Sequence, residues 1–182
     1  MKVTPLIIPD VLLIEPLVFE DARGFFFESF REDIFQKETS LKTNFVQDNH
    51  SKSSRGVIRG LHYQLPPHSQ GKLVRVIQGE VFDVVVDLRR SSPTFGQYIA
   101  EFLSDKNRKQ LWIPEGFAHG FMTISETSEF LYKTTSYYNA KDERCVLWND
   151  KFLNIPWPKN FNIELSPKDN LGSNFESSEF FP

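Results

Sequence analysis

Short apolar runs separated by turn residues make up most of the chain. The runs at residues 73–78 and 81–88 are separated by a Gly-Glu pair, and those at 110–113 and 117–124 by Pro-Glu-Gly. Four to eight apolar or β-branched residues bounded by turn residues are typical of a strand. The pattern therefore predicts successive strands joined by tight turns.

Further strands are predicted at residues 11–14, 15–19, 45–52 and 129–138. Pro16 lies within the first pair, and a proline cannot donate a hydrogen bond to a neighbouring strand. We therefore expect the segment around it to form a bend or an exposed edge of a sheet.

An aromatic segment follows the turn predicted at residues 21–24. If residues 25–30 form a strand, alternate side chains face opposite sides. One face then buries aromatic rings, and the other combines rings with the carboxylate of Glu28. The pattern leaves two interpretations open: a site for a flat polar ring, or a core strand with Glu28 at its wet edge.

Helical periodicity is almost absent. Residues 31–38 form the best short helix, because acidic residues occupy its first turn. The tail after Pro158 is expected to be irregular or partly helical, with residues 177–182 frayed. The fold predicted is all-β: an antiparallel sandwich or barrel with a few short helices, as one domain over residues 1–182.

The composition supports one packed domain and excludes some partners. Of 182 residues, 40% are hydrophobic, and 18 phenylalanines against 2 methionines favour stiff packing between sheets. The net charge of -3 gives no overall attraction to nucleic acid or to an anionic membrane. No apolar run approaches the ~20 residues that a membrane helix requires. We therefore expect no nucleic-acid partner and no membrane association.

A single cysteine, Cys145, cannot form an internal disulfide, which favours a reducing compartment. The N-terminal segment has no signal-peptide core. These two features predict a cytoplasmic protein. A nucleophilic role for Cys145 is weakly supported, because no histidine motif accompanies it.

The candidate chemistry is densest at residues 59–76, which hold two arginines, two histidines and a lysine next to strand residues. Polar head groups that share a partly buried space are costly unless something binds there. An imidazole such as His62 can take a proton at neutral pH, Lys72 can stabilise an oxyanion, and Arg59 can grip a phosphate. One short segment thus offers a base, an electrophile and an anion clamp.

A second polar segment lies at residues 47–51, where a predicted strand becomes abruptly polar. The amides of Gln47 and Asn49 could bind a base edge or a ribose. They could equally cap a turn.

Residues 114–119, Pro-Glu-Gly-Phe-Ala-His, resemble the second motif of the cupins, which are small double-sheet barrels. Many cupins bind a metal, so a metal-dependent enzyme using His62, His68 and His119 is one alternative. However, cupin ligands usually form a His-x-His pair, whereas five residues separate His62 from His68. We therefore predict no metal site.

Ordered sequence blocks cover nearly the whole chain: Asp21-x-Arg23-Gly24-x-Phe26-x-Glu28, Phe45-Val46-Gln47-Asp48-Asn49-His50-Ser51, Arg59-Gly60-Leu61-His62, Gln70-Gly71-Lys72-Leu73-Val74-Arg75, Gly79-Glu80-Val81-x-Asp83-Val84, Ser92-Pro93-Thr94-Phe95-Gly96, Trp112-Ile113-Pro114-x-Gly116-Phe117-Ala118-His119-Gly120-Phe121 and Leu165-Ser166-x-Lys168-Asp169. Together they resemble the dTDP-4-dehydrorhamnose 3,5-epimerases, cupin-like sugar-nucleotide epimerases of the rhamnose pathway. The chain departs at Tyr63, where phenylalanine is common, and at Asn170, where a small apolar residue is expected. Neither position matches a chemical role.

The resemblance implies roles for four catalytic residues and for His119, a substrate-binding residue beside them. His62 matches the family's base and Asp169 its orienting carboxylate, while Tyr132 matches the acid on the other face of the sugar. Lys72 and His119 match groups around the keto oxygen.

The resemblance also implies a set of substrate-binding residues. Arg59 and Arg23 match the clamp for the diphosphate and nucleotide, and Tyr138 matches an aromatic that stacks on thymine. Further contacts are implied for Phe26, Glu28, Gln47, Asn49, Glu143 and Lys168.

The implied reaction converts dTDP-4-dehydro-6-deoxy-D-glucose to dTDP-4-dehydro-L-rhamnose by inversion at C3 and C5. Inversion beside a ketone needs a base on one face, an acid on the other and a donor at the enolate oxygen. The ketone is itself the electron sink, so we expect no cofactor. A homodimer is expected, in which Arg23 and Glu28 complete the partner's site. A C3-only or C5-only epimerase, a metal-dependent cupin and a non-catalytic sugar-nucleotide-binding protein remain alternatives.

Overall fold

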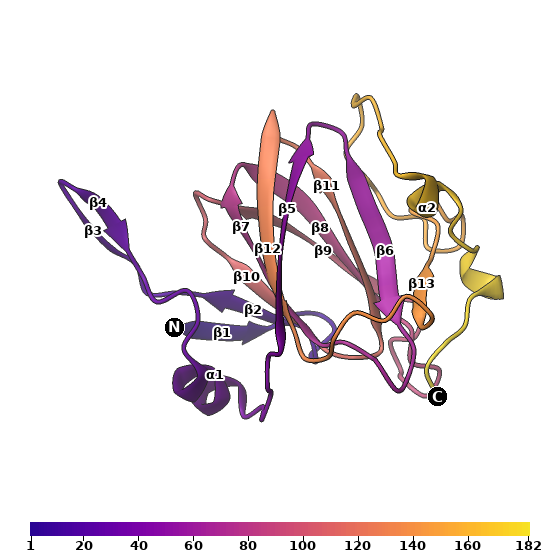
Figure 1. Ribbon diagram of the computed structural model, residues 1–182, viewed down its shortest axis with the longest axis horizontal. Coiled ribbons are helices and arrows are strands. Elements are labelled where there is room, and N and C mark those ends of the chain that lie inside the picture. Colours follow the sequence, from indigo (N-terminus) through magenta and orange to yellow (C-terminus); the bar gives the residue numbers. More distant parts are fainter.

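Two antiparallel sheets face each other in the computed structural model, which describes residues 1–182 (Figure 1). The six-stranded sheet has the order β1 (Lys2–Pro5), β2 (Leu12–Glu15), β10 (Gln110–Ile113), β7 (Lys72–Gln78), β12 (Thr127–Thr134) and β5 (Gln47–Ser54). The five-stranded sheet has the order β13 (Glu143–Cys145), β6 (Ile58–Gln64), β11 (Phe117–Thr123), β8 (Glu80–Asp87) and β9 (Tyr98–Ser104). The predicted all-β antiparallel sandwich is confirmed.

Few elements lie outside these sheets. They are the hairpin β3 (Phe19–Asp21) and β4 (Gly24–Phe26), the helices α1 (Glu32–Thr39) and α2 (Pro167–Asn170), and a 3₁₀ turn at Phe175–Ser177. The helix predicted at residues 31–38 is confirmed within one residue at each end.

Alternation along the strands fills the space between the sheets with aliphatic and aromatic side chains. Val74 and Leu111 from one sheet join Val85 from the other in a single buried cluster. Phe121 and Phe130 stack across this space, with ring centroids 4.2 Å apart and an angle of 12° between the rings. Offset stacking of buried rings adds to the stabilisation from burial alone. This packing joins the two sheets.

Each sheet is also covered on its outer face. Phe35 of α1 packs with Trp112 on the six-stranded sheet, at 5.8 Å between ring centroids. Trp157, Phe175 and Phe181 from the C-terminal segment bury the outer face of the five-stranded sheet. Both faces of both sheets are therefore partly buried, which explains why the strands read as near-continuous apolar runs.

The strand predicted at residues 25–30 is wrong beyond Phe26. The hairpin β3–β4 projects away from the two sheets (Figure 1). Phe25 and Phe26 are 58% and 66% exposed, so the rings of the hairpin are not buried within the chain, whereas Phe30 packs against Phe35 and Phe45. The physical reason is that β3 and β4 pair only with each other and have no further strand to pack against.

The edge predicted at residues 11–19 also needs correction. β2 lies between β1 and β10 and is largely buried, so β1 is the strand that forms this edge. Residues 16–18 are not in a strand; Glu15 ends β2 and Phe19 begins β3. β1 pairs with β2 along its whole length, so β2 is not the exposed edge strand that Pro16 had led us to expect.

Residues 177–182 were predicted to fray, and this prediction is wrong. Phe181 is only 8% exposed, and its backbone N–H donates to the Leu88 carbonyl oxygen at 3.1 Å. Its own carbonyl oxygen accepts from the Arg90 N–H at 2.9 Å. Burial of one aromatic ring and two backbone hydrogen bonds therefore hold the last residues against the sheet.

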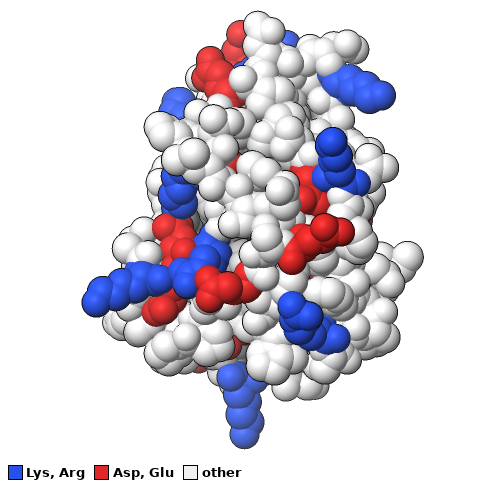
Figure 2. Space-filling model, turned by 90° about the vertical axis from the view of Figure 1, so that its right-hand side faces the viewer, with Lys and Arg blue, Asp and Glu red and all other residues white.

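Acidic and basic side chains are interspersed on the face that carries α2, without a broad patch of one sign (Figure 2). This face offers no extended basic surface of the kind that binds a nucleic-acid backbone. No helix has the length and apolar character needed to cross a bilayer.

Phe181→Ala tests the ordered C-terminus. Removing a buried phenylalanine ring typically costs about 3–5 kcal/mol, so the free energy of unfolding in urea should fall by at least about 2 kcal/mol for a ring at the edge of a core. Leu171→Ala, at a side chain that is 81% exposed in the same segment, is the matched control and should unfold like the wild type. Equal stability of both variants would mean that the tail is not bound to the sheet.

Candidate active site

Polar side chains from both sheets line a cleft of about 240 Å³. Lys72 and Tyr132 come from the six-stranded sheet, while Arg59, His62 and His119 come from the five-stranded sheet. The remaining lining residues are Ser51, Tyr63, Gln64, Gln70, Phe121, Phe130, Tyr138, Glu143 and Lys168. A group bound here has protein side chains on opposite sides.

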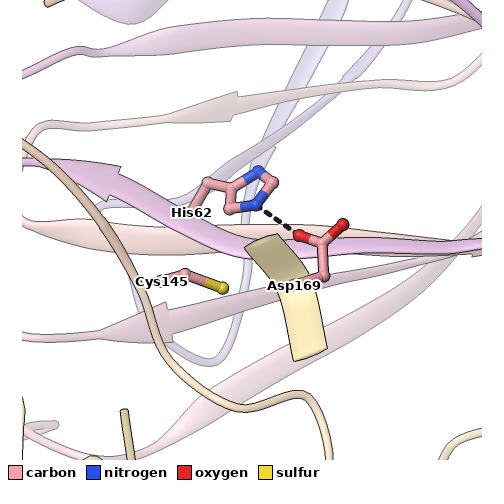
Figure 3. A group of neighbouring side chains, drawn as sticks. All are labelled: His62, Cys145 and Asp169. Atoms are coloured by element: carbon pink, nitrogen blue, oxygen red, sulfur yellow. Dashed lines mark hydrogen bonds and ion pairs between the residues drawn. The ribbon is translucent and has the colours of Figure 1, made fainter. Parts of the chain in front are cut away.

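His62 is bound to a buried carboxylate. Its Nε2 lies 2.5 Å from Oδ1 of Asp169, which is 3% exposed and lies on α2 (Figure 3). The carboxylate also accepts from the Gly60 N–H at 3.2 Å and the Ser166 hydroxyl at 2.6 Å. Burial alone raises the pKa of Asp169, but the hydrogen bonds from His62 and Ser166 outweigh it and lower the pKa to about 2.

The carboxylate therefore fixes the imidazole's tautomer. Because the ionised Asp169 can only accept, Nε2 of His62 carries a proton when it makes this bond. The other nitrogen, Nδ1, has no hydrogen-bond partner in the protein and is not sealed from solvent. Its lone pair is free to take a proton from a molecule in the cleft.

Strand register places two more groups beside His62. His119 on β11 and Cys145 on β13 are its direct cross-strand partners. Nε2 of His119 lies 2.9 Å from the buried carboxylate of Asp83. Burial raises the pKa of Asp83, and His119 and then Lys72 oppose that effect. A second imidazole–carboxylate pair thus adjoins the first.

Gly60 makes this register possible. Its φ is 113°, and a Cβ at this position would lie 2.5 Å from the carbonyl oxygen of His119. Only glycine combines this conformation with so close an approach of two strands. The register shifts here, so Arg59 is paired with Phe121 and His62 with His119, and both side chains reach the cleft.

Lys72 is a buried cation beside the base. Its Nζ donates to the carbonyl oxygen of His62 at 3.2 Å. Burial lowers the pKa of the Lys72 ammonium to about 8, while the charges of Glu143 and Asp83 act in the opposite direction. Lys72 is consequently charged at neutral pH and can stabilise negative charge that develops on a bound oxygen.

Tyr132 approaches the cleft from the opposite sheet. Its hydroxyl makes no hydrogen bond to the protein and is not sealed from solvent. Burial raises the pKa of the phenol, which the charge of Arg59 partly offsets. The phenol therefore keeps its proton at neutral pH and can donate it.

Charged groups surround the cleft opening. Arg59 uses two of its N–H groups, one to the Ser53 hydroxyl at 2.9 Å and one to the Lys52 carbonyl oxygen at 3.1 Å. A guanidinium has five such donors, so three remain for an anion. Glu143 accepts from the Tyr138 hydroxyl at 2.8 Å.

Glu143 also pairs with Lys168. Burial raises the pKa of Glu143, but Lys168 and Tyr138 outweigh it, so the pKa lies below its usual value. The carboxylate is thus ionised and neutralises one of the cations at the opening.

The structure brings most of the predicted site residues together, but not all. The cleft is lined by Arg59, His62, Lys72, His119, Tyr132, Tyr138, Glu143 and Lys168, with Asp169 directly behind His62. Gln47 and Asn49 lie beside it on β5, bonded to each other at 2.9 Å, and Gln47 accepts from the Tyr138 N–H at 3.1 Å. Arg23, Phe26 and Glu28 do not line the cleft of their own chain, because they belong to the projecting hairpin and the segment after it.

Sequence reasoning missed three residues next to the reactive groups: Ser51, Asp83 and Cys145. Alternation along β5 could have identified Ser51, because Gln47, Asn49 and Ser51 share a face. An acid within an apolar strand was the available signal for Asp83. No sequence signal indicated that Cys145 lies beside His62, since only the pairing of β13 with β6 brings them together.

The three histidines of the metal-dependent alternative do not form one ligand set. The potential ligand atoms of His62, His68 and His119 do not form one close group; His68 Nδ1 lies 2.6 Å from Asp142 and His119 Nε2 lies 2.9 Å from Asp83. The potential ligand atoms of His62, Cys145 and Asp169 do lie within 4.8 Å of one another. However, the imidazole and carboxylate of this group already bind each other, as the dashed line in Figure 3 marks.

The double-sheet fold is of the cupin-like class, and its cleft combines a carboxylate-bound histidine with a tyrosine from the other sheet. Similarity to three known proteins indicates the family within this class. A Pseudomonas aeruginosa dTDP-4-dehydrorhamnose 3,5-epimerase is 57% identical over 182 residues, covering 100% of both chains. The Legionella pneumophila dTDP-6-deoxy-D-glucose-3,5-epimerase in complex with dTDP-4-keto-L-rhamnose superposes with a TM-score of 0.95 at 44% identity, covering 98% of this chain and 94% of that one. A 3'-monoepimerase from Streptomyces bikiniensis in complex with dTDP-quinovose gives a TM-score of 0.89 at 30% identity, covering 95% and 87%.

A sequence profile described as dTDP-4-dehydrorhamnose 3,5-epimerase matches residues 5–177. The chain belongs to the dTDP-4-dehydrorhamnose 3,5-epimerase family.

Lys72→Arg tests the buried cation. The wild-type rate should fall as pH rises through about 8, because the ammonium of Lys72 loses its proton there. A guanidinium keeps its charge, so the alkaline fall in kcat/KM should move to higher pH in the variant. Lys72→Met should be slow at every pH, by about 10²-fold or more. An unchanged alkaline limb in Lys72→Arg would exclude Lys72 as its source.

Proposed function

We propose that this enzyme inverts C3 and C5 of dTDP-4-dehydro-6-deoxy-D-glucose to form dTDP-4-dehydro-L-rhamnose. The observation that carries the proposal is the placement of His62, with its carboxylate, and of Tyr132 on opposite walls of one cleft. Proton removal from one face and proton return to the other require this arrangement.

Nδ1 of His62 takes the proton from the carbon beside the C4 ketone. The electron pair of the C–H bond moves to the ketone oxygen and forms an enolate, while Asp169 stabilises the imidazolium. The charge of Lys72 and the imidazole of His119 stabilise the enolate oxygen. The Tyr132 hydroxyl then protonates the carbon from the opposite face, and solvent restores the two side chains to their starting protonation states.

The same groups can act at both carbons, because C3 and C5 both adjoin the ketone. The alternative is a single inversion, as the name of the S. bikiniensis relative states for that protein. We favour double inversion because the relatives named 3,5-epimerases are the more similar ones, at 44% and 57% identity against 30%. NMR of the product formed in deuterated water distinguishes one labelled carbon from two.

The nucleotide end of the substrate would be held by Arg59 and Tyr138 near the opening. Arg59 contributes its free donors to the diphosphate, and Tyr138 provides a ring for the thymine. Gln47, Asn49, Glu143 and Lys168 would make the remaining contacts within this chain. A cytoplasmic location stays a prediction.

A homodimer would complete the site. The projecting hairpin carries Arg23 and the exposed aromatic rings of Phe25 and Phe26, of which Phe25 is contacted by Arg108 and Phe27. A second copy related by a two-fold axis could take this hairpin against its own cleft and supply its hairpin in return. Arg23, Phe26 and Glu28 would then contact the nucleotide bound by the partner.

His62→Ala and Tyr132→Phe should fail in different ways. Removing the base should abolish turnover together with exchange of solvent deuterium into the substrate. Removing only the Tyr132 hydroxyl leaves His62 able to form the enolate and return a proton to the same face, so inversion should fall more than exchange. General acids and bases contribute about 10²–10⁴-fold. NMR of the recovered sugar measures both quantities.

Parallel losses of exchange and inversion in Tyr132→Phe would mean that Tyr132 positions the sugar and another group donates the proton. The matched control is Tyr137→Phe, because Tyr137 is an exposed tyrosine outside the cleft. Its exchange and inversion should both match the wild type.

Mixing two inactive variants tests the shared site. Arg23→Ala/Glu28→Ala keeps its own His62 but lacks the hairpin side chains, and His62→Ala has the reverse defect. If each hairpin serves the partner, half the sites in mixed dimers are intact, and random pairing restores about a quarter of wild-type activity. Mixtures that stay as inactive as the separate variants would show that the hairpin serves its own chain or does not reach a site.

A further inference from the structure

The inner face of β5 carries one hydroxyl that no protein group binds. Gln47, Asn49, Ser51 and Ser53 alternate onto this face. Gln47 bonds to Asn49, and the Ser53 hydroxyl accepts from Arg59. In contrast, Oγ of Ser51 is buried and has no hydrogen-bond partner, although the Ser51 side chain lines the cleft.

Such a group is costly in the free protein. A buried hydroxyl without a partner loses its hydrogen bonds to water and gains none in exchange. Only two other buried side-chain atoms lack a partner, in Thr43 and Arg108, and neither residue lines the cleft. Ser51 is therefore the one unpaired buried hydroxyl at the candidate active site.

The position of Ser51 limits what could bind it. It precedes Ser53, the anchor of Arg59, by two residues on the same face, and it is the cross-strand partner of Phe130 on β12. Tyr132 follows Phe130 by two residues on that strand and also lines the cleft. Ser51 thus lies between the guanidinium proposed to bind phosphate and the phenol proposed to protonate the sugar.

We propose that the Ser51 hydroxyl donates a hydrogen bond to a diphosphate oxygen at the sugar end of the nucleotide sugar. The inference rests on the proposed function and adds a substrate-binding residue to it. Rotation about the single χ1 torsion of serine directs the hydroxyl toward the cleft. The contact forms only in the complex, and because dTDP and the nucleotide sugar share the diphosphate, it contributes equally to the binding of both.

Because the partner is present only in the complex, Ser51→Ala has opposite effects on the two states. The free protein loses an unpaired buried hydroxyl and should melt at the wild-type temperature or above it. The complex loses a hydrogen bond to a charged acceptor, which lowers affinity for dTDP about tenfold to a hundredfold. A residue with a purely structural role would lower both the melting temperature and the affinity.

Isothermal titration calorimetry with dTDP alone and with dTDP-4-dehydro-6-deoxy-D-glucose tests the contact, with kcat and KM measured in parallel. Ser51→Ala should weaken both ligands by the same factor, and its catalytic defect should appear in KM rather than in kcat. Ser51→Cys, which keeps the side-chain size but is a poor donor, should behave similarly. Ser54→Ala, on the exposed outer face of the same strand, is the matched control and should bind like the wild type.

Wild-type affinity for dTDP in a folded Ser51→Ala protein would overturn the proposal. A loss confined to the sugar-bearing ligand would also overturn it, because the acceptor would then be a sugar hydroxyl. A lowered melting temperature in both Ser51 variants would assign Ser51 a structural role instead. The wild type separates these outcomes from failure of the proposed function: a wild type that neither binds the nucleotide sugar nor exchanges its protons would refute that function first.

Discussion

The hydrogen bond between His62 and Asp169 joins the last part of the chain to the centre of the sandwich. The two residues are 107 positions apart, and the carboxylate also accepts from Gly60 on the histidine's own strand. A carboxylate that is 3% exposed is tolerated only when its oxygens are hydrogen-bonded. Docking of α2 therefore satisfies Asp169 and, by the same contact, orients the imidazole, so the stability of this region and the geometry of the base depend on one interaction.

Other buried charged groups at the cleft also need a hydrogen-bonding or oppositely charged partner. Asp83 is fully buried and is paired with His119, while Lys72 lies close enough to both Asp83 and Glu143 to be influenced by their charges. Each buried charge thus has an opposite charge or a hydrogen-bonding partner nearby. The arrangement keeps a cation beside the base at neutral pH without leaving it unpaired. Ser51 is the exception in the cleft: its hydroxyl has no partner in the protein, and a bound ligand is expected to supply one.

The two-sheet architecture explains how acid and base face each other. Apolar packing around Phe121 and Phe130 joins the sheets in the core, and polar side chains line the cleft beside these rings. A strand of one sheet supplies Tyr132 and a strand of the other supplies His62. Groups on the same strand face could not act on opposite faces of a sugar ring, so the separation of the sheets is itself part of the chemistry. The projecting hairpin β3–β4 has no second sheet packed against it within the chain, and its rings Phe25 and Phe26 therefore remain largely exposed.

The sequence by itself determined the fold class, the short helix and most strands, because apolar runs and turn residues act over a few positions. Its ordered motifs also identified the family and named many, though not all, of the residues that line the cleft. Only the tertiary structure decided what depends on pairing between distant segments. Cross-strand register placed Cys145 and His119 beside His62. Burial decided that the hairpin β3–β4 projects outward while Phe181 is held against a sheet. The unpaired hydroxyl of Ser51 was equally invisible in the sequence, because a hydrogen bond is gained or lost through neighbours that come from other strands.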